Sequence, residues 1–215
     1  FIKDGDSFIV GSSPEVHIRV RGNKAYLCPI AGTKPRRATD KVEDIIDVLR
    51  NDEKERAEHL MLVDLARNDL SRICVPGSVA VESVMQPEGY SHGGHLVSQV
   101  SGDLESTADV VDAITQSFPA GTVSGAPKTR AIEIIGELED DARNAYSGCV
   151  GYIGFNGNVD MAITIRTAIF NGFNARMQAG AGIVYDSVPV KEYEEVMNKL
   201  GALIKSGGVH DRIDR

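Results

Sequence analysis

The chain has 215 residues, of which 42% are hydrophobic and 25% charged, a composition typical of a globular protein with room for one sizeable core. No apolar run approaches the roughly 18 residues needed to cross a membrane, and no secretory signal is recognisable. The three cysteines (Cys28, Cys74 and Cys149) are widely spaced, which argues against a disulfide framework or a thiolate zinc site and fits a cytoplasmic protein. The net charge of −8 argues against non-specific nucleic-acid binding, and an anionic substrate would need a bound metal or a few placed Arg and Lys side chains.

The first part of the chain is predicted to form short strands followed by two helices. Strands are expected over Ser7–Val10, Val16–Val20 and Lys24–Leu27, with a turn at Gly22 and Asn23. Helices are expected over Asp40–Arg50 and, behind a cap at Asn51 or Asp52, over Asp52–Leu70. Because a strand-like pattern begins close to Phe1, we expect the chain to lack its natural N-terminus.

The second part predicts an α+β fold with mostly antiparallel sheets and packed helices. Strands are expected over Ser78–Val84, Leu96–Val100, Val150–Phe155, Met161–Phe170 and Ala175–Ala179, and helices over Ala108–Ser117, Thr129–Leu138 and Lys191–Lys205. Blocks of strands alternate with blocks of helices, which favours this fold class over a parallel sheet. We expect one domain over residues 1–206 and a polar tail at 207–215.

Two of the predicted helices carry a Glu-x-x-Glu pair, formed by Glu55 and Glu58 on one and by Glu192 and Glu195 on the other. Residues three apart share a helix face, and partly buried carboxylates are costly unless they are paired or bound to metal. Two facing pairs would suit Mg²⁺, which binds few protein oxygens and keeps several waters. The alternative is two solvated faces, with Glu195 and Lys199 as a surface pair that contributes about 0.3–0.5 kcal/mol.

Two glycine-rich segments could bind anions, but neither is a nucleotide motif. Residues 178–183 (QAGAGI) follow a predicted strand, and their glycines would let backbone N–H groups approach an anion closely. The third glycine of a dinucleotide fingerprint is missing there. Residues 121–128 (GTVSGAPK) have the wrong spacing for a phosphate loop, and Pro127 stands where a glycine is needed. A plain tight turn is the alternative for both segments.

Three further features bear on chemistry. Arg166 falls inside the predicted strand Met161–Phe170, and an inward orientation would require an anionic partner because guanidinium keeps its charge. His92 and His95 form an HxxH pattern, but the glycines between them and the strand-like context favour a structural histidine over a zinc ligand. The sequence has no Gly-x-Cys-x-Gly or Gly-x-Ser-x-Gly nucleophile motif, and so no evident means of hydrolysing glutamine.

Taken together, five motifs resemble those of the chorismate-binding enzyme family. They are residues 11–15 (GSSPE), 29–33 (PIAGT), 52–69 (DEKERAEHLMLVDLARND), 119–128 (PAGTVSGAPK) and 178–184 (QAGAGIV). They occur in the family's order and cover the chain to about Ile204. The resemblance implies the family's α+β fold without its N-terminal part.

The resemblance also implies a Mg²⁺ site. Glu58 and Glu195 would bind the ion, and Glu55 and Glu192 would hold its waters. The ion would take the ring carboxylate of chorismate. Because chorismate is a dianion, an acidic protein needs such a cation together with basic side chains.

Further roles follow from the same resemblance. The enolpyruvyl carboxylate would be held by Arg166, Tyr146, the Gly182 backbone and Lys199. Catalysis would involve Glu15 as the general acid for the C4 hydroxyl, His95 near the ring carboxylate, and Thr122 in positioning the substrate. Gly32 and Thr33 would line the floor of the pocket. Hydroxide is a poor leaving group, so an acid must protonate it in the transition state.

Within the family, the chain resembles the ammonia-using anthranilate synthases. Ala31 stands where aminodeoxychorismate synthases commonly carry a lysine, and PAGTVSGAPK is similar to the ammonia users. The implied reaction converts chorismate and ammonia to anthranilate and pyruvate, the first step towards tryptophan. A glutamine amidotransferase subunit would supply the ammonia, giving a hetero-oligomer.

Alternatives and departures remain. Aminodeoxyisochorismate and aminodeoxychorismate synthases belong to the same family, and a non-catalytic binding homologue is the alternative from another class. Gly93 and Gly94 precede His95 where anthranilate synthases usually have bulkier residues, which affects the expected pocket shape.

Overall fold

A computed structural model of the chain describes residues 1–35, 42–90 and 93–206. The polar tail predicted at 207–215, the start of the helix predicted from Asp40, and His92 lie outside these residues. Two antiparallel sheets, six helices and their connections make up the described part, which confirms the predicted α+β class.

The larger sheet has seven strands. Its order is β5 (Ile30–Pro35), β7 (Gly93–Asp103), β4 (Lys24–Leu27), β3 (Val16–Arg21), β9 (Val159–Ile163) and β8 (Cys149–Ile153), and β6 (Ala80–Tyr90) pairs with β7. All of these pairings are antiparallel. The turn predicted at Gly22 and Asn23 joins β3 to β4, with Gly22 in the left-handed backbone region that favours glycine.

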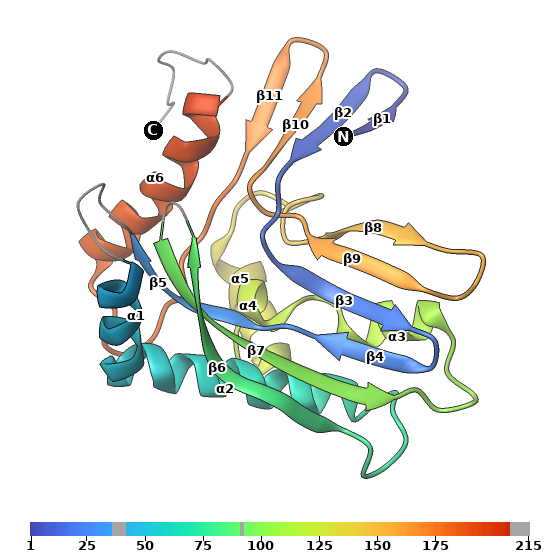
Figure 1. Cartoon of the computed structure of the whole chain (residues 1–215). Coiled ribbons are helices and arrows are strands. Elements are labelled where there is room, and N and C mark those ends of the chain that lie inside the picture. The colour runs from blue at the N-terminus through green and yellow to red at the C-terminus, as the bar shows by residue number, and fades with distance from the viewer. Residues whose placement is uncertain (36–41, 91–92, 207–215) are drawn as a thin grey trace.

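The smaller sheet has four strands, in the order β1 (Ile2–Asp4), β2 (Ser7–Gly11), β10 (Thr167–Asn171) and β11 (Asn174–Met177). It projects beyond the larger sheet as two hairpins side by side (Figure 1). Its central pair, β2 and β10, comes from opposite ends of the chain. The sheet therefore brings the N-terminal region next to the C-terminal third.

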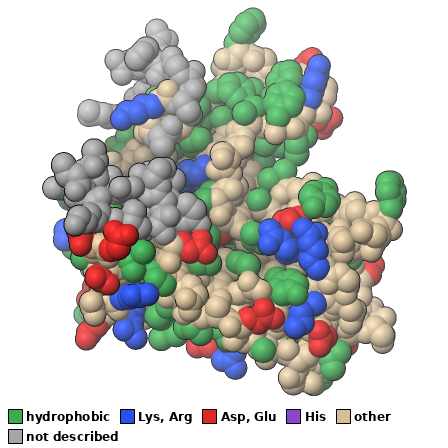
Figure 2. Space-filling view, in the orientation of Figure 1, with side chains coloured by type: hydrophobic (Ala, Val, Ile, Leu, Met, Phe, Trp, Pro, Cys, Tyr) green, Lys and Arg blue, Asp and Glu red, His purple; other side chains and the backbone are tan. Residues whose placement is uncertain are grey.

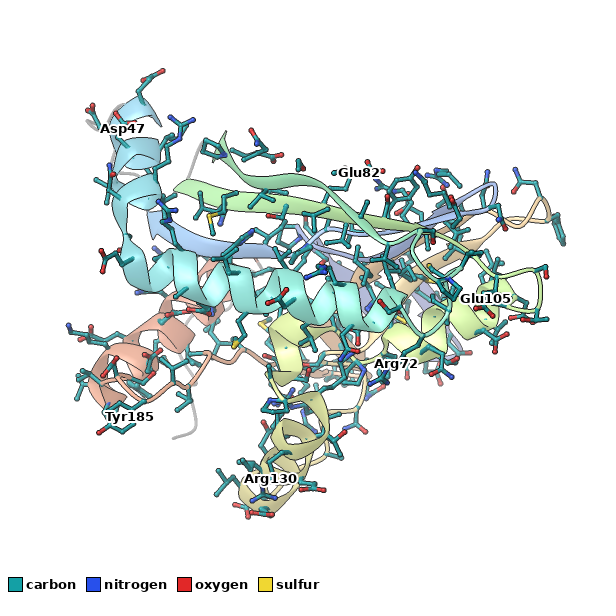
Figure 3. All side chains as sticks on the ribbon, turned by 90° about the horizontal axis from the view of Figure 1, so that it is seen from below. Asp47, Arg72, Glu82, Glu105, Arg130 and Tyr185 are labelled. Atoms are coloured by element: carbon teal, nitrogen blue, oxygen red, sulfur yellow. The ribbon has the colours of Figure 1, made fainter. Side chains whose placement is uncertain are left out.

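Helix α2 (Glu53–Leu70) lies across one face of the larger sheet (Figures 1 and 3). It begins at Asp52, whose side chain accepts a hydrogen bond from the Glu55 N–H at 3.2 Å and so satisfies one of the free donors of the first turn. Its apolar side packs into the main core, which contains buried residues of both layers: Ile18, Val20, Ala25, Val63, Ala66, Leu70, Val100, Ala113 and Val159.

The remaining helices are α1 (Val42–Asn51), α3 (Val110–Ser117), the single turn α4 (Gly121–Ser124), α5 (Lys128–Leu138) and α6 (Pro189–Ser206). Helix α1 places Ile45 and Leu49 against Leu96 of β7 in a second, smaller core. Helix α3 adds Ala113 to the main core, beneath a capping box formed by Asp109 and Asp112. Strands β1 and β5 and helix α4 were not predicted.

One predicted strand is wrong. Residues Met161–Phe170 form two strands, β9 and β10, which belong to different sheets. The break falls at Arg166, whose backbone has a φ of +51° and so cannot continue a strand. A run of mostly apolar residues does not reveal such a break, because the residues on both sides of it have ordinary strand composition.

Candidate functional site

The predicted site residues Glu15 and Arg166 lie where the chain passes between the two sheets. Glu15 stands in the connection from β2 to β3, and Arg166 in the connection from β9 to β10. Because β2 pairs with β10 and β3 with β9, the two connections run alongside each other. The Ser12 N–H donates to the Arg166 carbonyl at 3.2 Å, and the Ile163 N–H donates to the Glu15 carbonyl at 3.0 Å.

Glu15 is a buried carboxyl, with 9% of the residue exposed. Burial raises its pKa from 4.5 to about 7, although the Thr122 side chain, the Ile30 backbone and the charges of Arg166 and Lys199 each lower it. A carboxyl group with such a pKa is still partly protonated near neutral pH. It can therefore donate a proton to a departing group.

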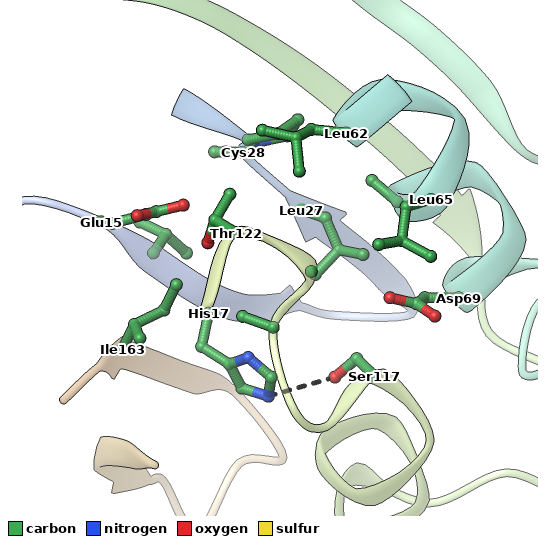
Figure 4. Close-up of a pocket in the computed structure, with 15 residues that line it drawn as sticks. Glu15, His17, Leu27, Cys28, Leu62, Leu65, Asp69, Ser117, Thr122 and Ile163 are labelled. Carbon is green, nitrogen blue, oxygen red and sulfur yellow. Dashed lines mark hydrogen bonds between the residues drawn. The ribbon is translucent and has the colours of Figure 1, made fainter. Parts of the chain in front are cut away.

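Thr122, in α4, lies beside Glu15 at one end of a cavity (Figure 4). The Thr122 side chain lowers the Glu15 pKa, although its buried hydroxyl oxygen has no hydrogen-bond partner among the described residues. The structure thus brings these two predicted catalytic residues together. Their roles stay predictions.

The backbone of Arg166 has a left-handed conformation. Next to it, the Thr167 hydroxyl donates a hydrogen bond to the Ile165 carbonyl at 2.8 Å. A non-glycine residue in this conformation costs about 1–3 kcal/mol and persists only where its surroundings impose it, commonly at functional sites. Its positive charge lowers the pKa of both Glu15 and the Tyr146 phenol, and burial raises the latter. The Glu15 carboxyl, when ionised, is therefore an anionic group that the charge of Arg166 reaches.

The glycine-rich segment at 178–183 follows β11 and connects several predicted site residues. The Lys199 ammonium donates to the Gly180 carbonyl at 2.9 Å and pairs with Glu195 at 2.5 Å. A Cβ added at Gly180 would lie 3.1 Å from the Tyr146 hydroxyl, so this segment passes close to the end of that side chain. Gly182 approaches Glu58 of α2 in the same way, since a Cβ there would lie 3.5 Å from Oε1.

The four acidic residues predicted to serve Mg²⁺ are placed on α2 and α6. Glu55, Glu58 and Glu192 are half-buried, whereas Glu195 is exposed and carries the ion pair with Lys199. Within the described ranges, no group of three or more His, Cys, Asp or Glu side chains lies close enough to hold a metal. Mg²⁺ commonly takes only one or two carboxylates, with waters and substrate oxygens completing its shell, so the donors fit that ion chemically.

His95, Gly32 and Thr33 belong to the paired strands β5 and β7, with Thr33 opposite His95 in the register. His95 is half-buried. Strand β5, which carries Gly32 and Thr33, lies against α2.

Sequence reasoning did not single out His59, Asp69, Lys128, His17 or Ser117. His59 is fully buried on α2, and its Nε2 lies 2.6 Å from the Ser98 hydroxyl of β7. Asp69 and Lys128 form a buried ion pair. Burial lowers the pKa of His17 to about 4, so it is neutral near Ser117. His59, Asp69 and Lys128 lie inside the motifs at 52–69 and 119–128, but spacing alone does not show which motif residues meet.

One cavity joins several of these groups (Figure 4). It measures about 40 Å³ for water-sized occupants, more than the roughly 10–15 Å³ that one water requires. Glu15 and Thr122 line it together with Asp69, Ser117 and His17. The wall between them is apolar and includes Leu27, Leu62 and Leu65.

The helices of the described ranges are too short or too polar to cross a membrane.

Comparison with known proteins gives a consistent result. The model of the family described as chorismate binding enzyme matches residues 1–205. The chain is 54% identical over 199 residues to anthranilate synthase component 1 of Aquifex aeolicus, covering 92% of this chain and 40% of that protein. It is 53% identical to the protein of the same name from Methanothermobacter marburgensis, covering 95% of this chain and 45% of the relative.

Solved structures agree. Anthranilate synthase component I from Streptococcus pneumoniae aligns with a TM-score of 0.84 at 43% identity, covering 93% of this chain and 44% of that one. The menaquinone-specific isochorismate synthase from Escherichia coli also aligns at 0.84, with 29% identity and coverage of 93% and 46%. The chain thus spans less than half the length of these relatives.

Proposed function

Because this chain belongs to the chorismate-binding enzyme family, we propose that it forms the catalytic part of an anthranilate synthase, which converts chorismate and ammonia to anthranilate and pyruvate. The observation that carries the proposal is the buried Glu15 carboxyl, whose pKa is raised to about 7 beside the charges of Arg166 and Lys199. Identities of 53–54% to two anthranilate synthases, against 29% to an isochorismate synthase, support this branch of the family.

Glu15 would act as the general acid. Its proton would pass to the C4 oxygen of chorismate as the C–O bond breaks, so that water leaves instead of hydroxide. Ammonia would form the new C–N bond at C2 and then release one proton. Thr122 would hold the substrate against Glu15. In a second step the C2 proton would be removed and the C3–O bond would break, and the departing enolpyruvate would take up a proton to become pyruvate.

The enolpyruvyl carboxylate would be held by Arg166 and Lys199, with the Tyr146 hydroxyl and the Gly182 N–H as neutral donors. Support for this grip comes from the way Lys199 and Tyr146 both meet the backbone of Gly180. Charged donors to a carboxylate form the stronger class of hydrogen bonds. His95 would lie near the ring carboxylate, and Gly32 and Thr33 below the ring.

Glu58 and Glu195 would hold Mg²⁺, with Glu55 and Glu192 orienting its waters. When bound, the ion would supply positive charge to the ring carboxylate and so offset the acidity of the protein. Glu195 would then have to share or release Lys199, with which it pairs. That exchange would free the Lys199 ammonium for the second carboxylate of the substrate.

A glutamine amidotransferase would supply the ammonia, because the sequence contains no nucleophile motif for glutamine hydrolysis. Ammonium salts at alkaline pH should replace that partner in the assay. The protein would work as a hetero-oligomer in the cytoplasm.

The test is turnover of chorismate with ammonium while Mg²⁺ is titrated, using the protein at its natural length. Anthranilate fluoresces, whereas aminodeoxyisochorismate would keep its side chain and be recognised by mass. Glu195→Gln should abolish Mg²⁺-dependent turnover, while Glu194→Gln, a change at the exposed neighbouring residue, should not. Unchanged turnover of Glu195→Gln across the titration would remove Glu195 from the metal site, and no anthranilate from the unaltered protein would refute the proposed function.

A further inference from the structure

The segment that carries Thr122, residues 118–127, runs from the end of α3 to the start of α5 and is fastened to α2 at two points. At the first point, Gly121 packs so tightly on Leu65 that an added Cβ would overlap the leucine side chain. At the second, the Lys128 ammonium donates to Asp69 Oδ2 at 2.7 Å and to the Ser117 carbonyl at 3.1 Å. Lys128 therefore ties together α2, α3 and α5.

The ion pair between Lys128 and Asp69 differs from the other ion pairs of these helices. Its side chains are only 11% and 4% exposed, whereas the pairs of Arg67 with Asp64 and of Arg130 with Glu133 are exposed on the same helices. A buried ion pair is often no more stabilising than apolar residues of similar volume, because both charges lose their hydration. Stability alone is thus a weak reason for burying charges here.

The position of this pair relates it directly to Glu15. Asp69 and Ser117 line one end of the cavity, and Thr122 and Glu15 line the other (Figure 4). Lys128 fixes the segment between them from the Asp69 end. If the pair were lost, the segment would keep the packing of Gly121 on Leu65 and the hydrogen bond from the Arg143 guanidinium to the Val123 carbonyl at 2.7 Å, but not its tie to the end of α2.

We propose that Asp69 and Lys128 are positioning residues for the general acid, and that their ion pair holds residues 118–127 so that Thr122 stays against Glu15. This inference rests on the proposed function, in which Glu15 donates the proton. Neither residue touches the substrate. Their effect on the reaction passes through Thr122.

A positioning role predicts a particular kinetic signature. The Thr122 side chain lowers the pKa of Glu15, so displacing it should raise that pKa further and move the basic limb of the kcat/KM profile to higher pH. At the same time kcat should fall by about 10- to 100-fold, since a displacement near 1 Å can have such an effect. Mg²⁺ affinity should change little, because Glu58 lies three helical turns from Asp69.

The experiment compares Asp69→Asn, Lys128→Met and the double variant Asp69→Leu/Lys128→Met in the protein at its natural length, with ammonium as the nitrogen source. Each single variant leaves one charge buried without its partner and should lower both Tm and kcat. The double variant removes both charges and should recover Tm, yet kcat should stay low and the basic limb should stay shifted. Asp64→Asn and Arg130→Gln, exposed changes on the same helices, serve as matched controls.

Recovery of wild-type kcat in the folded double variant would overturn the inference, since the pair would then be merely structural. A second measurement does not depend on turnover: carbon-13 NMR of the Glu15 carboxyl and the Thr122 methyl group. Both signals should shift in the double variant and stay unchanged in the controls. Unchanged signals would overturn the inference even in an active enzyme, whereas shifted signals in a protein that makes no anthranilate would uphold the positioning and refute only the proposed function.

Discussion

The two sheets of this protein differ in how they are stabilised. The seven-stranded sheet is backed by α2 and contributes fully buried residues such as Ile18, Val20 and Val159. In the four-stranded sheet, the described side chains include only two buried ones, Thr167 and Ala168. Apolar side chains gather on the surface of its projecting hairpins instead, as Figure 2 shows and as the exposure of Phe1, Ile2, Val10 and Phe173 records.

The difference explains where the candidate site lies. The larger sheet, together with α2 and α4, supplies a well-packed wall with Thr122, Glu58 and the cavity, because buried apolar area stabilises it by about 25 cal/mol per Å². The smaller sheet has little such stabilisation, but its strands run straight into the connections that carry Glu15 and Arg166. The site is therefore at the seam between a well-packed region and a poorly packed one.

Glu15→Gln should have the largest effect on turnover among changes at the candidate site between the two sheets. Turnover should fall by about 10²–10⁴-fold, the usual contribution of a general acid. The Glu15 pKa is raised in the folded state, so the protein keeps its full stability below pH 4.5, where this carboxyl is protonated in both the folded and the unfolded state. Stability is lost as pH rises towards about 7, because the carboxyl ionises more readily in the unfolded chain. Glutamine stays neutral, so the variant should be up to about 3 kcal/mol more stable at pH 8.

Urea unfolding of both proteins at pH 4 and pH 8 measures this effect. The stability difference between variant and wild type should vanish at the lower pH. An active Glu15→Gln variant with unchanged pH dependence would place the proton donor elsewhere.

Arg166→Ala should lower kcat/KM, and the loss should correspond to about 2–5 kcal/mol of transition-state stabilisation. This is the usual effect of removing one partner of a buried charged contact. Arg166→Lys keeps the charge but not the planar fork, and should recover only part of the loss. Steady-state kinetics in ammonium and Mg²⁺ measures both. A near-wild-type value for the alanine variant would take Arg166 out of the site.

Leu70→Ala, in the helix that backs the larger sheet, and Phe173→Ala, in a hairpin of the smaller sheet, test this difference in stabilisation. Leu70 is fully buried in the main core, so its truncation should reduce the free energy of unfolding by about 2–5 kcal/mol. Phe173 is fully exposed at the tip of the smaller sheet, and its truncation should change stability by less than about 0.5 kcal/mol. Denaturant unfolding measures both, and equal losses would show that the two sheets are not stabilised differently.

Arg67→Gln should have the smallest effect. The pair of Arg67 with Asp64 is exposed on α2, and such pairs typically contribute about 0.2–1 kcal/mol. Thermal melts at low and high salt should differ little between variant and wild type. A loss comparable to that of Leu70→Ala would contradict the view that the buried face of α2, and not its surface charge, holds the larger sheet.

Local signals predicted most elements and failed at particular places. The cap at Asp52, the turn at Gly22 and the long helix over α2 were all recognisable, since each depends on neighbouring residues. Strand β1 and helix α4 are too short for a periodic pattern. The break at Arg166 had no local signal, because a left-handed arginine is imposed by the pairing of β2 with β10.

The amino-acid sequence by itself determined the α+β class, the antiparallel pairing, the order of the motifs and the family to which they belong, because periodicity, turn residues and motif spacing are local properties of the chain. Only the tertiary structure decided which motif residues meet: Glu15 with Thr122, Lys128 with Asp69, and the 178–183 segment with both Tyr146 and Lys199. The physical reason is that these contacts join segments up to about a hundred residues apart. Such contacts depend on how the sheets and helices pack together, which no local pattern specifies.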